Sequence, residues 1–147
     1  MYKHILLPTD GSTLSLKAVK QGLRFAKSIG AAVTAVYSSP GVPIEFFEYG
    51  AAVPESVLQA EERRIRQLAE RYLAAVAKLA KAAGVRCDCV VVEQRVPYQA
   101  IIETAKKRRC DLIFMASHGR RGIKGLLLGS ETTKVLTHSK IPVLVCR

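Results

Sequence analysis

The stretch CDLIFMASHGRRGIKGLLLGSET, residues 110–132, joins an apolar run to a glycine-rich loop and then to the start of a helix. Residues 111–116 are nearly all apolar, which is typical of a strand covered on both faces in a parallel sheet. Ser130 is placed to cap the helix that follows, and Glu131 stands in its first turn, where negative charge is favoured. The stretch therefore predicts a strand, a loop and a helix of an α/β protein.

The rest of the chain repeats this alternation. Apolar runs predict strands at residues 3–7, 31–38, 85–93 and 141–147. Helical spacing of apolar residues predicts a helix capped by Ser12 or Thr13 and closed by Gly30, and a long helix over Glu55–Ala83 closed by Gly84. A further helix begins at Pro97. Residues 39–54 show no clean period and predict a long loop that could fold over a ligand.

Five strands alternating with four helices predict the fold class. We expect one domain over residues 1–147, built on an open, doubly wound, five-stranded parallel sheet of the Rossmann-like α/β class. Ligands bind such sheets beyond the carboxyl ends of the strands, at the point where the strand order reverses. The loops after the first and fourth strands are therefore the candidates for a binding site.

Composition narrows the possible partners. Of the 147 residues, 23 are Lys or Arg and 12 are Asp or Glu, so the formal charge is +11 and favours anionic partners. Aromatic residues make up only 6% and the basic residues are scattered along helices, which argues against nucleic-acid binding. No apolar run has membrane length and the N-terminus lacks a secretory pattern, so we expect a cytoplasmic protein with no membrane partner. The four cysteines show no zinc or disulfide spacing and predict buried, reduced thiols.

The loop from Ser117 to Ser130 has the features of an anion cradle. Its glycines let backbone N–H groups approach an anion closely, and the helix start adds unpaired N–H donors and a partial positive charge. Its glycines and basic residues are Gly119, Gly122, Gly125 and Gly129 with Arg120, Arg121 and Lys124. The alternative is a surface turn whose glycines permit a sharp return and whose cations are solvated. Neither GxxxxGK[ST] nor a GxGxxG after the first strand is present, so the site is not of the Walker or dinucleotide type.

The chain resembles the universal stress proteins over essentially its whole length. The resemblance rests on the opening YKHILLPTDGS, the strand DLIFMAS, the loop HGRRGIKGLLLGS and the ending IPVLVCR, together with the order of strands and helices. In the ATP-binding branch of that family the loop reads G-x2-G-x9-G-[ST]. The matching positions are Ala116, Gly119, Gly129 and Ser130, so an alanine stands where the pattern has its first glycine. The added methyl is tolerable there if φ is negative.

The resemblance implies an adenine nucleotide as ligand: ATP, with AMP or cyclic AMP as alternatives, and Mg²⁺ as an accompanying ion. The segment Pro8, Thr9 and Asp10 would line the adenosine, with Asp10 contacting the base or the metal, and Ser38 would match the adenine contact by position only. Around the sugar and phosphates, the matched positions are Met115 and Ala116 beside the ribose, Gly119 and Gly129 as N–H donors, and Ser130 and Glu131 at the helix start. Glu131 would act only through its backbone N–H, because its carboxylate would repel phosphate. Asp10 could instead simply form the turn before the first helix.

The resemblance also implies a homodimer joined through the last strand, and an apolar strand at a sheet edge invites such pairing. An interior strand would fit its hydrophobicity equally well. The implied role is a stress sensor or regulator with an unidentified protein partner. No paired base and nucleophile is visible, and we expect His118 to be structural or on the surface, so any ATPase activity should be weak. Two alternatives stay open: an interaction module that has lost nucleotide binding, and a slow nucleotide hydrolase.

Overall fold

A computed structural model describes residues 1–48, 53–119 and 128–147. Its five strands form one parallel sheet in the order β3-β2-β1-β4-β5. The strands are β1 (His4–Pro8), β2 (Ala32–Ser39), β3 (Cys87–Glu93), β4 (Leu112–Ala116) and β5 (Val143–Cys146). The chain builds outward from β1 to β3, then returns to add β4 and β5 on the other side of β1. The predicted open, doubly wound sheet is confirmed, and its order reverses between β1 and β4.

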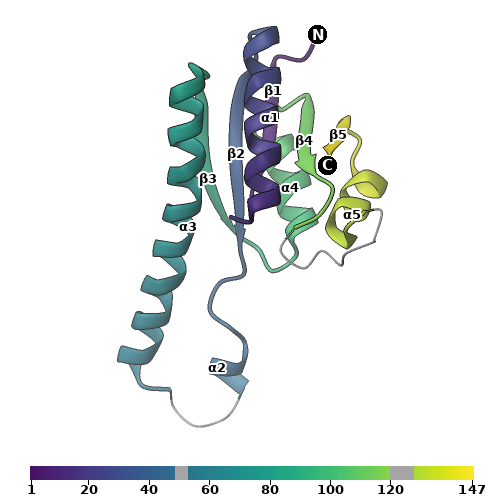
Figure 1. Cartoon of the computed structure of the whole chain (residues 1–147). Helices are drawn as coiled ribbons and strands as arrows, with labels where there is room; N and C mark the ends of the chain where they lie inside the picture. The colour runs from purple at the N-terminus through teal and green to yellow at the C-terminus, as the bar shows by residue number, and fades with distance from the viewer. Residues whose placement is uncertain (49–52, 120–127) are drawn as a thin grey trace.

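Helices cover both faces of this sheet (Figure 1). On one face lie α1 (Thr13–Ile29) and α3 (Glu55–Ala83), and on the other lie α4 (Pro97–Lys107) and α5 (Ser130–His138). The alternation of side chains along β1 shows the two layers, because Leu7 packs with α1 and α3 whereas its neighbour Leu6 packs with α4 and α5. All five residues of β4 are buried, as expected for a strand covered on both faces.

Local signals set the ends of the helices as predicted. The Ser12 hydroxyl accepts a hydrogen bond from the Ser15 N–H at 3.1 Å and caps α1. Gly30 and Gly84 each follow a helix in the left-handed conformation, with φ of 69°. Pro97 is the first residue of α4.

Several details differ from the sequence prediction. A short helix, α2 (Glu45–Glu48), lies within the predicted loop of residues 39–54, of which residues 49–52 are outside the described part. Strand β3 begins at Cys87 rather than at residue 85. The N-cap of α5 is Gly129, with extended backbone, and Ser130 is already helical, so the predicted Ser130 cap is wrong.

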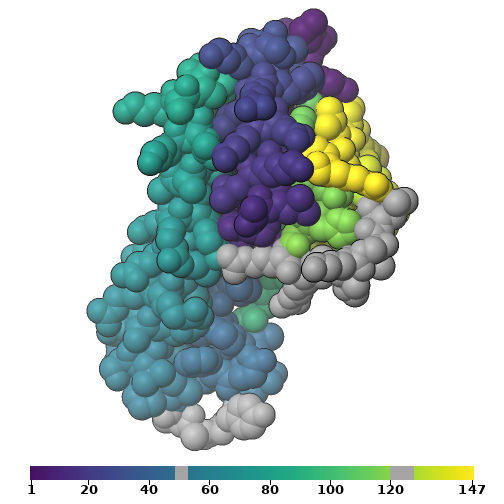
Figure 2. Space-filling model, in the orientation of Figure 1, coloured from purple at the N-terminus to yellow at the C-terminus, as the bar shows by residue number. Residues whose placement is uncertain are grey.

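The prediction of buried thiols is wrong for three of the four cysteines, although all are free. Only Cys110 is buried, whereas Cys87 and Cys146 are half-buried and Cys89 is exposed. The physical reason is position, because Cys87 and Cys89 lie on β3 and Cys146 on β5, and these are the two edges of the sheet. Figure 2 shows the C-terminal residues at the surface on the side of the molecule away from α3.

Helix α3 is longer than the strands that it covers. Its first turns extend beyond the ends of the strands, toward α2 (Figure 1).

Within the part of the chain that the structure describes, no helix has the length and apolar character needed to cross a bilayer.

Candidate functional site

The loops after β1 and β4 meet at the reversal of strand order. Strands β1 and β4 are direct neighbours, with Ile5 opposite Leu112 and Leu6 opposite Ile113, so both loops begin at the same edge of the sheet. The loops also touch: a Cβ added to Gly119 would lie 2.6 Å from Asp10 Oδ2. A side chain at residue 119 would therefore require the Asp10 carboxylate to shift. The structure thus brings together Asp10 and Gly119, which the sequence placed in one site.

The turn after β1 is held by its own side chains. Asp10 Oδ1 accepts a hydrogen bond from the Ser12 N–H at 2.9 Å, which is the turn-forming role considered for this residue. The hydroxyl of Thr9 lies 3.1 Å from Ser15 Oγ and accepts a bond from the Gly11 N–H at 3.2 Å. Thr9 is buried, so its side chain shapes the turn rather than facing a ligand. Asp10 divides its two oxygens between the turn and the approach to Gly119.

The start of α5 offers backbone donors next to this turn. The Gly129 N–H donates to the Ser117 carbonyl at 2.8 Å, so the N–H predicted to bind phosphate is engaged within the protein. The first bond inside the helix runs from the Thr133 N–H to the Gly129 carbonyl at 3.0 Å. A helix cannot pair the N–H groups that precede its first bond, and a glycine N-cap has no side chain to do so. Donors for an anion at this end are therefore those of Ser130 and the residues after it.

The Glu131 carboxylate is already bound by groups within the protein. Its Oε2 accepts a hydrogen bond from the Tyr98 N–H at 2.9 Å, at the first turn of α4, and its Oε1 lies 2.8 Å from Lys134 Nζ. The side chain therefore ties α5 to the N-terminus of α4. Only the backbone of Glu131 is available to an anion at the start of α5.

The remaining predicted residues occupy structural positions. Met115 is buried in the cluster between the sheet, α4 and α5. Ala116 is 7% exposed and its carbonyl accepts a hydrogen bond from the Thr132 hydroxyl at 3.1 Å. Its φ is negative, because Arg109 is the non-glycine residue with positive φ in the described ranges. Pro8 is the last residue of β1, and the Ser38 hydroxyl donates to the Gln94 carbonyl at 2.7 Å.

The surroundings of the His118 ring were not predictable from the sequence. Its Nδ1 lies 3.0 Å from Ser117 Oγ, and its Nε2 is buried with no hydrogen-bond partner among the described residues. The His118 ring also borders Gly129, since a Cβ added there would lie 3.7 Å from Cδ2. Burial of a single ring nitrogen has no sequence signature, and only the place of His118 between strand and glycine could have suggested it. The predicted contributions of Arg120, Arg121, Gly122, Lys124 and Gly125 lie outside the described residues.

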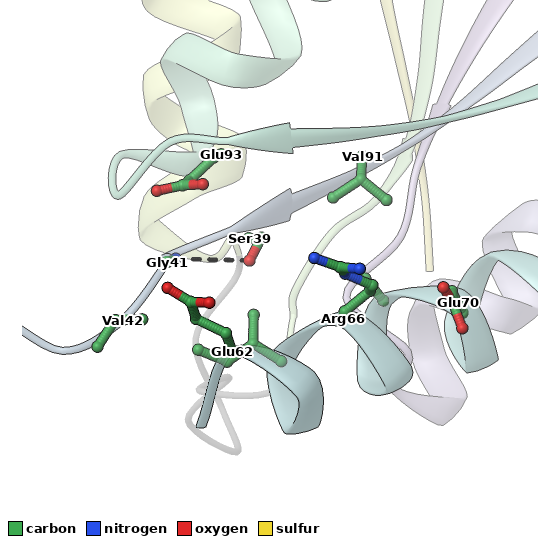
Figure 3. Close-up of a pocket in the computed structure, with 10 residues that line it drawn as sticks. Ser39, Gly41, Val42, Glu62, Arg66, Glu70, Val91 and Glu93 are labelled. Atoms are coloured by element: carbon green, nitrogen blue, oxygen red, sulfur yellow. Dashed lines mark hydrogen bonds between the residues drawn. The ribbon is translucent and has the colours of Figure 1, made fainter. Parts of the chain in front are cut away.

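A separate hollow of about 530 Å³ lies between α3 and the carboxyl ends of β2 and β3 (Figure 3). Its charged lining consists of three carboxylates, Glu62, Glu70 and Glu93, and one guanidinium, Arg66. This excess of negative charge disfavours phosphate. None of the residues predicted to contact the nucleotide lines it. In the described parts of the chain, no group of three or more His, Cys, Asp or Glu side chains is arranged to hold a metal ion.

Comparison with known proteins identifies the family. The model of the universal stress protein family matches residues 1–147. The chain belongs to the universal stress protein family. This finding confirms the resemblance inferred from the sequence motifs.

Relatives of known sequence or structure agree with this membership. Universal stress protein MJ0531 of Methanocaldococcus jannaschii is 32% identical over 147 residues, covering 100% of this chain and 83% of that protein. The structure of MJ0577, a universal stress protein of the same organism, has a TM-score of 0.82 at 28% identity, covering 99% of this chain and 95% of that one. A universal stress protein in complex with cAMP has a TM-score of 0.69 at 25% identity, covering 99% and 97%.

Proposed function

We propose that this universal stress protein binds an adenine nucleotide, with ATP preferred, where the loops after β1 and β4 meet. The observation that supports the proposal best is the contact of Asp10 with Gly119 at the reversal of strand order. We further propose that the protein is a cytoplasmic dimer that senses or regulates the stress response through a protein partner.

The surroundings of this contact fit a nucleotide. The buried Nε2 of His118 needs a hydrogen-bond partner, which a polar group of a ligand would supply. The start of α5 presents backbone N–H groups and the positive end of the helix dipole. The net charge of +11 favours an anion in general. Ala116 adds a methyl, but its negative φ is compatible with alanine.

The comparisons support binding of an adenine nucleotide, and they leave the choice among ATP, AMP and cyclic AMP to experiment. The structure of a relative, 25% identical, is that of a universal stress protein in complex with cAMP. AMP and cyclic AMP are therefore the alternatives to ATP. If Mg²⁺ accompanies the nucleotide, Asp10 is the carboxylate at the meeting point of the loops that would hold it.

The proposal assigns binding rather than turnover. His118 has the Ser117 hydroxyl as its described partner, but among the residues that the structure describes no group pairs with His118 Nε2 to orient the ring as a catalytic base. Hydrolysis at the pace of ordinary enzymes, on the order of 10 per second, would contradict this assignment.

Calorimetry on protein freed of copurified nucleotide tests the proposal, with ATP, AMP and cyclic AMP titrated with and without Mg²⁺. We expect ATP to bind with a dissociation constant on the order of 1 μM. Gly129→Val should weaken binding at least about tenfold, because a Cβ at Gly129 would lie 3.3 Å from both the Ser117 oxygen and the His118 Cα and would displace the start of α5.

Thr137→Val is the matched control, because Thr137 lies exposed at the other end of the same helix. Its affinity should equal that of the unaltered protein. Circular dichroism melting of each variant separates loss of the site from loss of the fold. If none of the three nucleotides binds at about 1 mM, the site is not a nucleotide site. The interaction module, with Ala116 as the departure from the nucleotide-binding pattern, then becomes the better assignment.

A further inference from the structure

Strand β3 has an open edge on its side away from β2. In the sheet that the structure describes, β3 is a terminal strand and pairs with β2 only. The Gln94 N–H, directly after β3, donates to the Ser39 carbonyl at 2.8 Å. Alternate residues of a parallel strand bond to the same side, so the backbone groups of Cys89, Val91 and Glu93 point away from β2. Such unpaired donors and acceptors can pair with one more strand.

The side chains of β3 show that this edge is uncovered. Four of its seven residues are exposed, whereas no residue of β2 beside it is exposed. Val91 is 47% exposed, which is a large fraction for an aliphatic side chain in a strand. Proteins often protect an open edge with proline or lysine, and Cys87–Glu93 contains neither. The edge is therefore accessible to another chain.

The hollow of Figure 3 adjoins this edge. Val91 and Glu93 line it from β3, and Arg66 and Glu70 line it from α3. Tyr72 marks the flank of α3 that touches the turn before α1. Arg66 and Glu70 lie on the opposite flank, because a helix turns by about 100° per residue. A strand added outside β3 would therefore run along the hollow, with every second side chain pointing toward α3.

The lining of the hollow favours a basic side chain. Its three carboxylates outnumber its single guanidinium. Among the described residues, none of these carboxylates, Glu62, Glu70 and Glu93, forms an ion pair. The apolar side chains of Ile65 and Val91 also line the hollow and suit the aliphatic stem of a lysine or arginine. The charged end of such a side chain would meet the unpaired carboxylates.

A second copy of β3 fits this edge less well than a basic segment does. Within Cys87–Glu93 the charged residues are Asp88 and Glu93, and none is basic. Pairing two copies through this strand would bring like charges together, which is unfavourable across a pair of strands. Charge complementarity therefore favours a different, basic partner.

We propose that the outer edge of β3 binds an extended basic segment of a partner protein. The segment adds one more strand to the sheet and places a lysine or arginine side chain in the hollow, beside Glu70 and Glu93. Main-chain hydrogen bonds give affinity in this mode of binding, and the hollow gives selectivity for the basic residue. The choice of a protein as occupant rests on the proposed action through a protein partner, whereas the edge itself is formed without a nucleotide.

Fluorescence anisotropy with a synthetic peptide tests this proposal on the full, nucleotide-free protein. The probe is a short labelled peptide that alternates threonine and valine, with one arginine in place of the central threonine. The arginine and the threonines then share one face of the strand. We expect a dissociation constant on the order of 100 μM. A peptide with glutamate in place of the arginine should bind at least about tenfold more weakly, because it brings a negative charge to the carboxylates.

Two further peptides test the addition of a strand. Each is the arginine peptide with N-methyl groups on alternate amides, on the odd positions in one and on the even positions in the other. Only one of the two sets of amides faces β3, so one peptide should lose binding and the other should keep it. Equal binding of the two would contradict strand addition. This comparison uses the unaltered protein, so it does not depend on whether any variant folds.

Variants of the protein test the hollow and the edge separately. Glu93→Gln should weaken binding of the arginine peptide about threefold, whereas Asp88→Asn, which removes the same charge from the opposite face of β3, should not. Val91→Pro removes a backbone donor from the outer edge and should weaken binding about tenfold. Val91→Ala keeps that donor and should have a smaller effect.

Three outcomes would overturn the proposal. The first is no binding of the arginine peptide at about 1 mM, and the second is equal affinity for the arginine and glutamate peptides. The third is a smaller mass by light scattering for Val91→Pro alone than for the unaltered protein, which would make this edge an interface between copies of the chain. Because the peptide is titrated without nucleotide, a failure of the proposed nucleotide site leaves this result readable.

Discussion

Gly11 shows how one residue couples the candidate site to the longest helix. It has a φ of +75°, and a Cβ added there would lie 2.2–2.6 Å from atoms of the Tyr72 ring. Tyr72 belongs to α3 and packs edge-on against Tyr37, with ring centroids 5.3 Å apart. The turn that carries Asp10 therefore lies directly against the ring of Tyr72.

We expect Gly11→Ala to destabilise the protein by more than its backbone conformation alone would explain. Gly30→Ala is the matched control, because Gly30 has a φ of +69° with nothing within 4 Å of the added Cβ. Each substitution should cost about 1 kcal/mol for the left-handed backbone, and Gly11→Ala should cost about 1–3 kcal/mol more for the collision with Tyr72. Urea unfolding of both variants measures the difference. Equal losses would mean that the ring moves aside freely.

Single residues also show where prediction from sequence stops. The alternation of strands and helices placed the loops that hold Asp10 and Gly119 at one end of the sheet, and the family resemblance added Asp10 itself to the site. The pattern could not show that the Gly129 N–H is taken by the Ser117 carbonyl or that His118 Nε2 is buried. Such details depend on the path of the loop backbone, which the order of residue types does not determine.

Among the elements, β1 and β4 are joined at their beginnings by a carboxylate. Asp111 accepts hydrogen bonds from the backbone N–H groups of Lys3, at 2.8 Å, and His4, at 3.0 Å. Slight burial works to raise the pKa of Asp111, but these backbone donors outweigh it and hold the pKa below its ordinary value of 3.8. The ionised form is therefore preferred in the folded protein.

We expect Asp111→Asn to lower the free energy of unfolding by about 1 kcal/mol at neutral pH. Because the folded pKa is depressed, the stabilisation by Asp111 is present above pH 3.8 and is lost as the pH falls through the folded pKa. The difference between the two proteins should therefore shrink in acid. Urea unfolding at pH 7 and near pH 3 measures it, with Asp88→Asn, an exposed carboxylate on β3, as control. A difference that does not change with pH would contradict the assigned role.

The elements were predictable to unequal degrees. Helix α3 has the predicted bounds because its apolar period is long and Gly84 ends it. Helix α2 was missed because a single turn, Glu45–Glu48, is too short to show a period. The thiols were misjudged because the usual burial of cysteine does not tell a central strand from an edge, and Cys87 and Cys89 lie on an edge.

At the scale of the whole molecule, the open edge of β5 bears on the proposed dimer. The carbonyl groups of Pro142 and Cys146 accept hydrogen bonds from the side of β4. Alternate residues of a parallel strand bond to the same side, so the Val145 N–H points away from β4, toward a second copy in the proposed dimer.

We expect light scattering to give a mass of about twice 16.1 kDa for the unaltered protein. Val145→Pro should give monomers, because it removes a backbone donor at the outer edge. Val145→Ala, which loses side-chain packing but keeps the N–H, should stay dimeric. A monomeric unaltered protein would contradict the dimer, and a dimeric proline variant would contradict pairing through β5.

The packing of Tyr72 on Gly11 has an optical consequence. The chain holds five tyrosines and no tryptophan, so its ultraviolet emission comes from tyrosine alone. Two of those five rings, Tyr37 and Tyr72, lie against each other beside the turn that precedes α1. Any ligand that rearranges this turn changes the environment of a large share of the emitting groups. The protein thus carries a built-in fluorescent reporter at its candidate site, and binding can be followed without attaching a dye.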